Sequence, residues 1–393
     1  MKTIESIAKN LKNKKIILRL DLNVPLKKQN ITDSNRIDKI LPTLNFLINN
    51  NAKILILSHV GRPKGKKIKE FSMEPICNYL KKKLNLNINF IKTDIHNLKK
   101  QDLFDDTKKG ILMLENLRFY DGEEQNNEEF AKTLASFGDL YVNDAFSCSH
   151  REHASVTKIT KYVPSYAGIQ LMSEITALKK ITKNIVRPIT CIIGGSKIST
   201  KINVIKNLIS KFDNLIFVGG MANNILKNKN YQIGKSIFEE DCDDIVKSIF
   251  ALSKKESCKL IYPVDVSVSK EINGSGSIKK ISEILEDDLI LDIGPETVKI
   301  LNKIIDESKT VLWNGPAGFF ENENFKNGSL EIAKKISEKN KKNEIYSVAG
   351  GGDTVAALNS FNLTKHFNFV STAGGAFLEF LEGRDLPGIK ALY

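Results

Sequence analysis

Short runs of apolar residues alternate along the chain with longer stretches that carry apolar residues at helical spacing among many Lys and Glu residues. In the first half, the apolar runs lie in KIILRLDLNVP, AKILILSHVGRP, GILMLENLRF and DLYVNDAF. In the second half, they lie in ITCIIGGSK, NLIFVGGMAN, KLIYPVDVSV, TVLWNGPAGFF, EIYSVAGGGDT and NFVSTAGGAF. Helical spacing is found between them, as in IDKILPTLNFLINN, EEFAKTLASF, INVIKNLISKF and GSLEIAKKISEKN. Because strands buried on both faces read as continuous apolar runs, this pattern predicts parallel sheets covered by helices.

The length of the chain favours two domains. A chain of 393 residues is longer than one hydrophobic core usually supports. Residues 169–182 have helical spacing without Gly or Pro, which predicts a stiff connecting helix. We therefore expect one domain over residues 1–168, the connecting helix over 169–182 and a second domain over 183–375.

Basic and polar side chains follow the predicted strands of the first half. Asp21 and Asn23 lie at alternate positions after the first strand, so their side chains share one face. The other members of the set are Arg36, His59, Arg62, Arg118 and Arg151. In open parallel sheets ligands bind at the carboxyl ends of the strands, and guanidinium groups bind carboxylate and phosphate. One such arginine has an ordinary structural role more often than not, but the whole set predicts a site for a polyanion.

Glycine clusters follow the predicted strands of the second half. GGSK (194–197) precedes a helix with Lys201, and we expect Lys197 and Lys201, four positions apart, to share one helical face. The further clusters are GGMAN (219–223), WNGPAGFFE (313–321) and GGGDT (350–354). The last one opens a predicted helix, whose free N–H groups suit a phosphate, and Asp353 offers an oxygen ligand to a Mg²⁺ ion carried by phosphates. Four clusters at successive strand ends predict a nucleotide site, although any one alone is usually a turn.

Composition and charge reduce the number of functions that are possible for this chain. The net charge of +13 comes mostly from lysines spread along the chain, which favours a solvated surface. Five cysteines are scattered without a Cys-x-x-Cys pair, which argues against disulfides or structural zinc, and His150 and His153 fit hydrogen bonding better than metal binding. No apolar run is long enough for a membrane span, and the N-terminus has no secretory pattern, so we expect a cytoplasmic protein.

Two other classes remain as alternatives: a basic nucleic-acid-binding protein and an NAD-dependent dehydrogenase on a similar fold. The first would need Lys and Arg clustered with aromatic residues, and the second a GxGxxG motif, and the sequence has neither. GxxxxGK[ST], HRD and DFG are also absent, which excludes a Walker-type site and the protein kinases. A member that has lost activity and serves as a scaffold is the third alternative.

The motifs taken together resemble those of the phosphoglycerate kinase family. The matching runs, in order, are RLDLNVP, ITDSNRI, SHVGRP, LENLRF, VNDAF, HREHAS, GGSKISTK, LWNGPAGFFE, GGGDT and STAGGAFLEFLEG. The resemblance implies an α/β fold of two doubly wound, Rossmann-like domains joined by a hinge helix, with the tail 376–393 packed back on the first domain. Departures from the family pattern are SCSHR (147–151) for GTAHR, TAGG (372–375) for a triple glycine, and Ala317 for methionine.

The resemblance also implies an activity and its residues. The implied reaction is in-line phosphoryl transfer from 1,3-bisphosphoglycerate to MgADP, giving 3-phosphoglycerate and MgATP in glycolysis. The enzyme would be a monomer whose two domains close by bending at residues 169–182 and 371–375. It would bind neither nucleic acid nor membrane. The implied phosphoglycerate ligands are Asp21, Asn23, Arg36, His59, Arg62, Arg118 and Arg151. The implied nucleotide ligands are Gly195, Lys197, Lys201, Gly219, Asn314, Pro316, Glu321, Gly351, Gly352, Asp353 and Thr354. The implied catalytic residues are Arg36, Lys201, Gly351 and Gly352, with Asp353 as the ligand of Mg²⁺.

Overall fold

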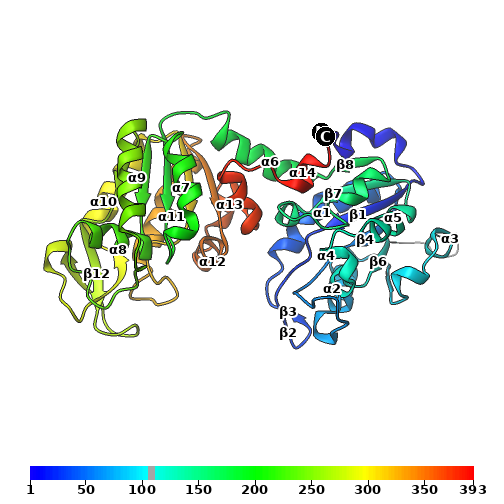
Figure 1. Cartoon of the computed structure of the whole chain (residues 1–393), viewed down its shortest axis with the longest axis horizontal. Coiled ribbons are helices and arrows are strands. Elements are labelled where there is room, and N and C mark those ends of the chain that lie inside the picture. The colour runs from blue at the N-terminus through cyan, green and yellow to red at the C-terminus, as the bar shows by residue number, and fades with distance from the viewer. Residues whose placement is uncertain (105–110) are drawn as a thin grey trace. The chain divides into compact units, whose positions relative to one another are not determined.

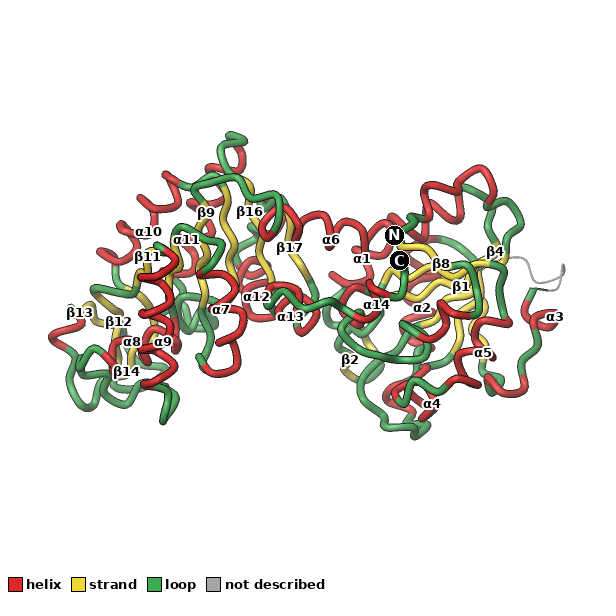
Figure 2. Tube along the Cα trace, turned by 45° about the horizontal axis from the view of Figure 1, so that its top comes forward, coloured by secondary structure: helices red, strands yellow, loops and turns green. Residues whose placement is uncertain are grey.

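The structure is a computed structural model that describes residues 1–104 and 111–393 (Figure 1). The chain forms two compact units. The first unit contains residues 1–175 and 385–393, and the second contains residues 176–384. Figure 2 shows the strands of each unit running between helices, as expected for a parallel sheet that is covered on both faces.

The first unit is built on a six-stranded parallel sheet in the order β5-β6-β4-β1-β7-β8. Its strands are β1 (Lys15–Leu20), β4 (Lys53–Leu57), β5 (Ile88–Ile91), β6 (Ile111–Leu114), β7 (Leu140–Asp144) and β8 (Ser165–Ala167). The hairpin β2 (Leu26–Lys27) and β3 (Asn30–Ile31) is separate. The helices are α1 (Asn35–Asn49), α2 (Glu74–Leu84), α3 (Lys100–Leu103), α4 (Asp121–Glu124) and α5 (Glu128–Ser136).

Apolar burial fixes this sheet against its helices. Alternate residues of β1, such as Ile16 and Leu18, are fully buried and share one core cluster with Ile40 and Leu44 of α1. The pairs β1–β4 and β1–β7 are in register, so that Leu57 and Asn143 both lie opposite Arg19. The ends of β1, β4 and β7 therefore lie at one edge of the sheet, where the loops that follow them come together.

The second unit has its own six-stranded parallel sheet, in the order β11-β10-β9-β15-β16-β17, and a three-stranded antiparallel sheet, β13-β12-β14. The parallel strands are β9 (Ile189–Ile193), β10 (Asn214–Phe217), β11 (Lys259–Ile261), β15 (Thr310–Asn314), β16 (Tyr346–Gly350) and β17 (Phe369–Ser371). The antiparallel strands are β12 (Asp265–Ser269), β13 (Ser277–Lys280) and β14 (Leu289–Ile293). The helices are α7 (Ile202–Ile209), α8 (Gly219–Asn228), α9 (Asp243–Glu256), α10 (Pro295–Glu307), α11 (Asn327–Lys341), α12 (Gly352–Ser360) and α13 (Gly375–Leu381).

The α/β fold with two parallel sheets is confirmed, but one predicted strand is wrong. The run KLIYPVDVSV forms two strands, β11 and β12, which belong to different sheets. Pro263 lies between them, and proline has no N–H group to offer to a continuous ladder. The antiparallel partners β13 and β14, the short strands β5 and β8 and the β2–β3 hairpin were not predicted. The run LILDI of β14 is as apolar as strands that were predicted, whereas β13, β8 and the hairpin have no such run.

Two segments carry the chain from one unit to the other. Helix α6 (Ile169–Thr182) coincides with the predicted connecting helix, and the boundary between the units falls inside it, after Ile175. The second boundary follows Arg384, later than the 371–375 segment and the expected start of the tail at residue 376. Residues 376–384 belong to the second unit, and α14 (Pro387–Lys390) belongs to the first, where Gly388 N donates to Ser149 O at 2.8 Å.

We find no helix in the described part of the chain that has both the length and the apolar character needed to cross a bilayer.

Candidate active site

The loops after β1 and β4 and the first turn of α1 bring an acid, an amide and an arginine together in the first unit. Arg36 Nη1 donates to Asp21 Oδ1 at 3.1 Å and to Asn23 O at 3.2 Å. The Asn23 side chain accepts from Gly61 N at 2.9 Å, which fixes its amide to the loop after β4. The other Asp21 oxygen accepts a hydrogen bond from Ser147, one of the residues that departs from the family pattern. Asp21 is therefore oriented from two sides.

His59 is held as a neutral imidazole by Arg19. The His59 ring is almost fully buried, and its Nδ1 lies 3.0 Å from Arg19 Nη2. A guanidinium can only donate, so Nδ1 accepts and the ring proton is on Nε2. Burial, followed by the charges of Arg19 and Arg118, holds the pKa of His59 well below its usual range. His59 therefore offers one N–H donor, without a charge of its own.

The remaining basic side chains differ in how far contacts within the protein hold them in place. The Arg118 side chain is largely buried, donates to Gly61 O at 2.9 Å and lies 3.4 Å from Glu124 Oε1. Arg62 and Arg151 are exposed, and neither forms an ion pair with any residue that the structure describes. The charge of Arg151 lies near enough to His153 to help lower its pKa to about 3, after burial and Arg118. The predicted basic residues thus lie around one edge of one sheet, some fixed and some available to a ligand.

In the second unit, Lys201 connects the ends of two neighbouring strands. Its Nζ donates to Gly194 O at 2.8 Å and to Asn314 Oδ1 at 2.7 Å. The Asn314 amide in turn donates to Gly350 O at 2.7 Å, and Gly315 N donates to Thr354 Oγ1 at 2.7 Å. Burial lowers the pKa of Lys201 to about 8. A half-buried ammonium with one N–H left over is well suited to an anion that enters this site.

Glycine is required at the strand ends for steric reasons. Gly315 has φ +111, and a Cβ there would lie 2.5 Å from the backbone of Gly194. Gly351 has φ +96, and a Cβ would lie 2.5 Å from the amide nitrogen of Asn314. No described atom lies within 4 Å of a Cβ built on Gly352, so the N-terminus of α12 opens into free space. The sequence folds this way because only glycine allows such close backbone approach.

A cavity of about 500 Å³ lies beside these glycines, inside the second unit. Gly195 and Gly219 line it together with Pro316 and Asp353. Its wall is mostly apolar and includes Ile237, Ile272, Leu291, Ile293 and Phe319. An apolar cavity with one glycine-lined end fits a flat base with phosphates attached.

Two expectations about the nucleotide side need qualification. The prediction that Lys197 and Lys201 share a helical face is wrong, because Lys197 precedes the 3₁₀ turn Ser199–Lys201 and is exposed in the loop. Gly195 and Ser196 break the helical pattern there, with φ +128 at Gly195. Glu321 is also exposed, in the turn that follows Phe320, and does not line the cavity.

The residues present fit a magnesium ion that arrives with its ligand. Within residues 1–104 and 111–393, no group of three or more His, Cys, Asp or Glu side chains could hold a metal alone. Asp353 is exposed in the first turn of α12 and lines the cavity. One carboxylate beside a phosphate site is a typical donor set for Mg²⁺, which keeps several waters and phosphate oxygens as its other ligands.

Comparison with known proteins decides the family. The family model described as phosphoglycerate kinase matches residues 4–384. The chain belongs to the phosphoglycerate kinase family. A phosphoglycerate kinase of Wolbachia sp. subsp. Drosophila simulans (strain wRi) is 45% identical over 386 residues, which cover 98% of this chain and 96% of the relative. One from Zymomonas mobilis is 43% identical over 394 residues, which cover 100% and 99%.

Solved phosphoglycerate kinase structures agree with the fold. The structure from Coxiella burnetii has a TM-score of 0.88 at 41% identity, covering 98% of this chain and 97% of that one. The structure from Pyrococcus horikoshii OT3 has a TM-score of 0.85 at 28% identity, covering 100% and 98%.

Sequence reasoning missed the buried support of this phosphoglycerate kinase site. Arg19 is fully buried, and its Nε donates to Ser155 Oγ at 2.9 Å. Ser155 Oγ donates in turn to Glu123 Oε1 at 2.6 Å, and Glu123 is also fully buried. Arg19 itself was recognisable as a charge in the otherwise apolar run KIILRL, at alternate positions with Asp21 and Asn23, but its buried partners were not. Nothing in the sequence around Glu123 distinguishes it from a surface acid.

Proposed function

We propose that this chain catalyses the phosphoglycerate kinase reaction, the reversible transfer of a phosphoryl group from 1,3-bisphosphoglycerate to MgADP, in glycolysis. The observation that carries the proposal is the pairing of family membership with two different strand-edge sites. One site is built from arginines and a neutral histidine, and the other from glycine turns, a half-buried lysine and an apolar cavity. We also propose that the enzyme works as a monomer in the cytoplasm.

The first unit is the proposed phosphoglycerate-binding domain. Asp21 is oriented by Arg36 and Ser147, and its carboxylate suits a hydroxyl of the glycerate. Arg36 lies beside the reacting carboxyl in this proposal, where its guanidinium offsets the charge of the transferring group. The N–H group of His59 and the guanidinium groups of Arg118, Arg62 and Arg151 complete the cradle for the distal phosphate.

The second unit is the proposed nucleotide-binding domain. The apolar cavity takes the base, and the N–H groups at Gly351 and Gly352, where α12 begins, take the phosphates. Lys201 donates its remaining hydrogen to a phosphate oxygen. Exposed Lys197 and Glu321 act from the rim, on the phosphates and the ribose respectively. The remaining proposed contacts come from Gly195, Gly219, Asn314, Pro316, Asp353 and Thr354.

The chemistry needs positioning and charge neutralisation more than acid–base groups. The attacking carboxylate or phosphate oxygen is already ionised, so no general base is required. Negative charge spreads over the oxygens of the transferring group, and fixed donors such as Arg36, Lys201 and the first N–H groups of α12 are most effective there. A bound Mg²⁺ ion, held by Asp353 and the nucleotide, would supply additional positive charge to the phosphate oxygens.

The two ligands are proposed to bind to different units, so transfer requires the units to bring them together. We propose that this closure bends the chain at α6 and at the segment around 371–375. Closure would also exclude water, which otherwise hydrolyses an acyl phosphate. Small-angle scattering tests this step directly. The radius of gyration is expected to fall when 3-phosphoglycerate and a MgATP analogue are both present, and identical curves with and without the ligands would contradict closure.

A direct assay tests the function. Purified protein is incubated with 1,3-bisphosphoglycerate and MgADP, and ATP is measured as it forms. We expect ATP formation that depends on both substrates and on magnesium. A folded protein that forms no ATP under these conditions would refute the proposed activity.

A further inference from the structure

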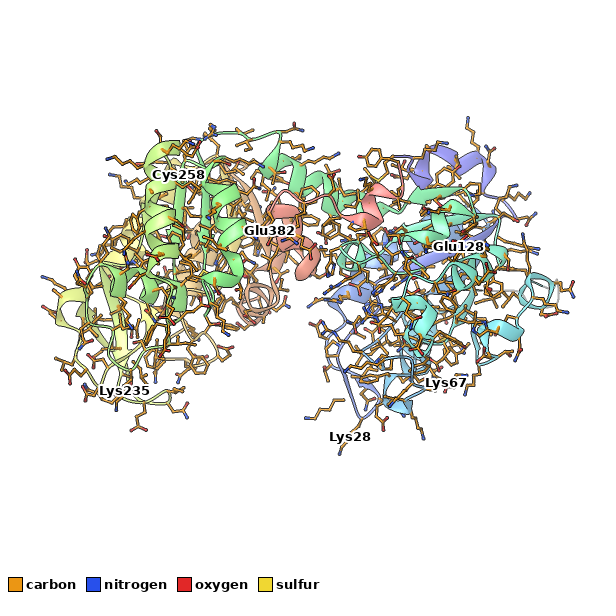
Figure 3. The ribbon with its side chains drawn as sticks, viewed as in Figure 1. Lys28, Lys67, Glu128, Lys235, Cys258 and Glu382 are labelled. Carbon is orange, nitrogen blue, oxygen red and sulfur yellow. The ribbon has the colours of Figure 1, made fainter. Side chains whose placement is uncertain are left out.

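The first unit has a second cavity, of about 510 Å³, that none of the proposed active-site residues lines. We call it the hairpin cavity, because the β2–β3 hairpin forms one wall and α2 forms the other. Its volume is in the range of small-molecule sites. Lys28 lies at the tip of this hairpin (Figure 3).

The hairpin cavity is lined by an excess of positive charge. Lys28, Lys69 and Lys82 come from three separate segments, the hairpin, the 3₁₀ turn before α2, and α2 itself. None of them forms an ion pair with an acidic side chain in the described parts of the chain. Glu74 is the one acid in this wall, and its Oε1 lies 2.8 Å from Lys92 Nζ. Three lysines against one glutamate leave the wall with a net charge of +2.

Neutral hydrogen-bonding groups complete the lining. They are the side chains of Gln29, Asn30, Ser72, Asn78 and Tyr79. The N–H groups at the start of α2 are already occupied, because Met73 N donates to Glu115 Oε1 at 2.7 Å and Glu74 N donates to Ser72 Oγ at 3.2 Å. The attraction for an anion therefore comes from the lysine ammonium groups, which are point charges suited to phosphate.

The hairpin turn places two of the lining residues at positive φ. Lys28 and Gln29 form its two central positions, with φ +48 and φ +64. Such a turn strongly favours Asn-Gly, because a longer side chain at positive φ is strained. Here the strained positions carry Lys and Gln, and both line the cavity. Strain of this kind is often found at ligand sites.

We propose that the hairpin cavity is a second ligand site, for a small organic anion that carries two phosphate groups or a phosphate and a carboxylate. A single phosphate would fill only part of a cavity of about 510 Å³. The concave shape and the mixture of amide, hydroxyl and ammonium groups favour a compact metabolite over nucleic acid or a lipid surface. The site is separate from the proposed phosphoglycerate site and does not depend on the proposed function.

Equilibrium dialysis of radiolabelled inorganic pyrophosphate tests the proposal. The full chain is used without other ligands, because 3-phosphoglycerate and ADP are themselves anions of the proposed class. We expect one pyrophosphate to bind in the hairpin cavity, in addition to any that binds at the active site. The variant Lys28→Ala/Lys69→Ala/Lys82→Ala should weaken this binding at least tenfold. The matched control Lys9→Ala/Lys12→Ala/Lys14→Ala, which removes three exposed lysines elsewhere in the first unit, should bind as the wild type does.

Three results would overturn the proposal. One is that pyrophosphate binds equally to the wild type and to the variant Lys28→Ala/Lys69→Ala/Lys82→Ala. Another is an equal loss of binding in the control variant, which would indicate bulk charge alone. The third is that single-stranded RNA or anionic lipid vesicles bind through the same lysines while pyrophosphate does not. ATP formation is measured in parallel and should be the same in both variants, so a failure of the proposed activity would be seen separately.

Discussion

Lys201 makes the most specific prediction about the nucleotide side. Its ammonium has two of its three N–H groups on Gly194 O and Asn314 Oδ1, and its pKa is about 8. Between pH 7 and pH 9 the charged fraction of such a group falls about tenfold. Since kcat/KM reports groups of the free enzyme, we expect kcat/KM for MgATP to fall about tenfold over the same interval.

Replacement by methionine removes the charge and keeps the length of the side chain. A hydrogen bond from a charged group is worth about 1.5–3 kcal/mol, so Lys201→Met should lower kcat/KM for MgATP roughly 10- to 150-fold near pH 7. The decrease between pH 7 and pH 9 should disappear in this variant. Lys197→Met is the control, because it removes an exposed lysine from the same loop and should keep the decrease.

The assay is 3-phosphoglycerate-dependent ADP formation from MgATP, followed by chromatography so that no coupling enzyme limits the pH range. The reasoning would be refuted by a wild-type kcat/KM that is flat to about pH 9.5, or by the same decrease in Lys201→Met.

The same pKa shift predicts a pH-dependent stability. The pKa of Lys201 is lower in the folded protein than in the unfolded chain, so folding releases a proton between these two values. The free energy of unfolding should therefore rise with pH from about 8 to 10.5, by up to about 3 kcal/mol relative to Lys201→Met. Urea unfolding of the wild type and of Lys201→Met at pH 8 and pH 10.5 measures the difference in their free energies of unfolding. A difference that does not change with pH would contradict the lowered pKa of Lys201.

Three further variants test the rest of the site. Arg36→Ala should lower kcat far more than it raises KM for 3-phosphoglycerate, because the contact of Arg36 with the transferring group strengthens in the transition state. A kcat within about threefold of the wild type would contradict that role. Asp353→Ala should raise the magnesium concentration that gives half-maximal activity, and an unchanged magnesium dependence would place the ion elsewhere. Gly351→Ala should lower the free energy of unfolding by about 1–3 kcal/mol, because its φ is +96 and the new Cβ would meet Asn314. Gly352→Ala, where the Cβ meets nothing within 4 Å, is its stability control, and equal losses in urea unfolding would argue against the steric explanation.

Much of the fold could be predicted because its parallel strands are buried on both faces. Runs such as Ile189–Ile193 and Ile54–Leu57 are fully buried and mostly apolar, and the helix over 169–182 was found at its observed bounds. In the antiparallel sheet, β13 lacks this signal. In Ser277–Lys280, for example, most residues are exposed, and the run is held by pairing with β12, which the sequence alone does not reveal.

The site residues could be nominated from sequence, but their relationships could not. Strand ends and glycine clusters were enough to select Arg36, His59, Lys201 and Asp353. The protonation state of His59 depends on Arg19, which lies forty positions earlier and reaches the ring only because β1 and β4 are paired. The loop geometry at Gly195 likewise separates Lys197 from Lys201, and no spacing rule for helices applies there.

The account rests on two ligands binding to two different units, and amide chemical-shift mapping of the whole chain tests this most directly. We predict that 3-phosphoglycerate shifts the amide signals of Asn23, Gly61 and Arg118, and that ADP shifts those of Gly195, Gly219 and Gly352. If both ligands shifted signals of the same unit, or if 3-phosphoglycerate shifted signals only around the glycine turns, the account would be wrong.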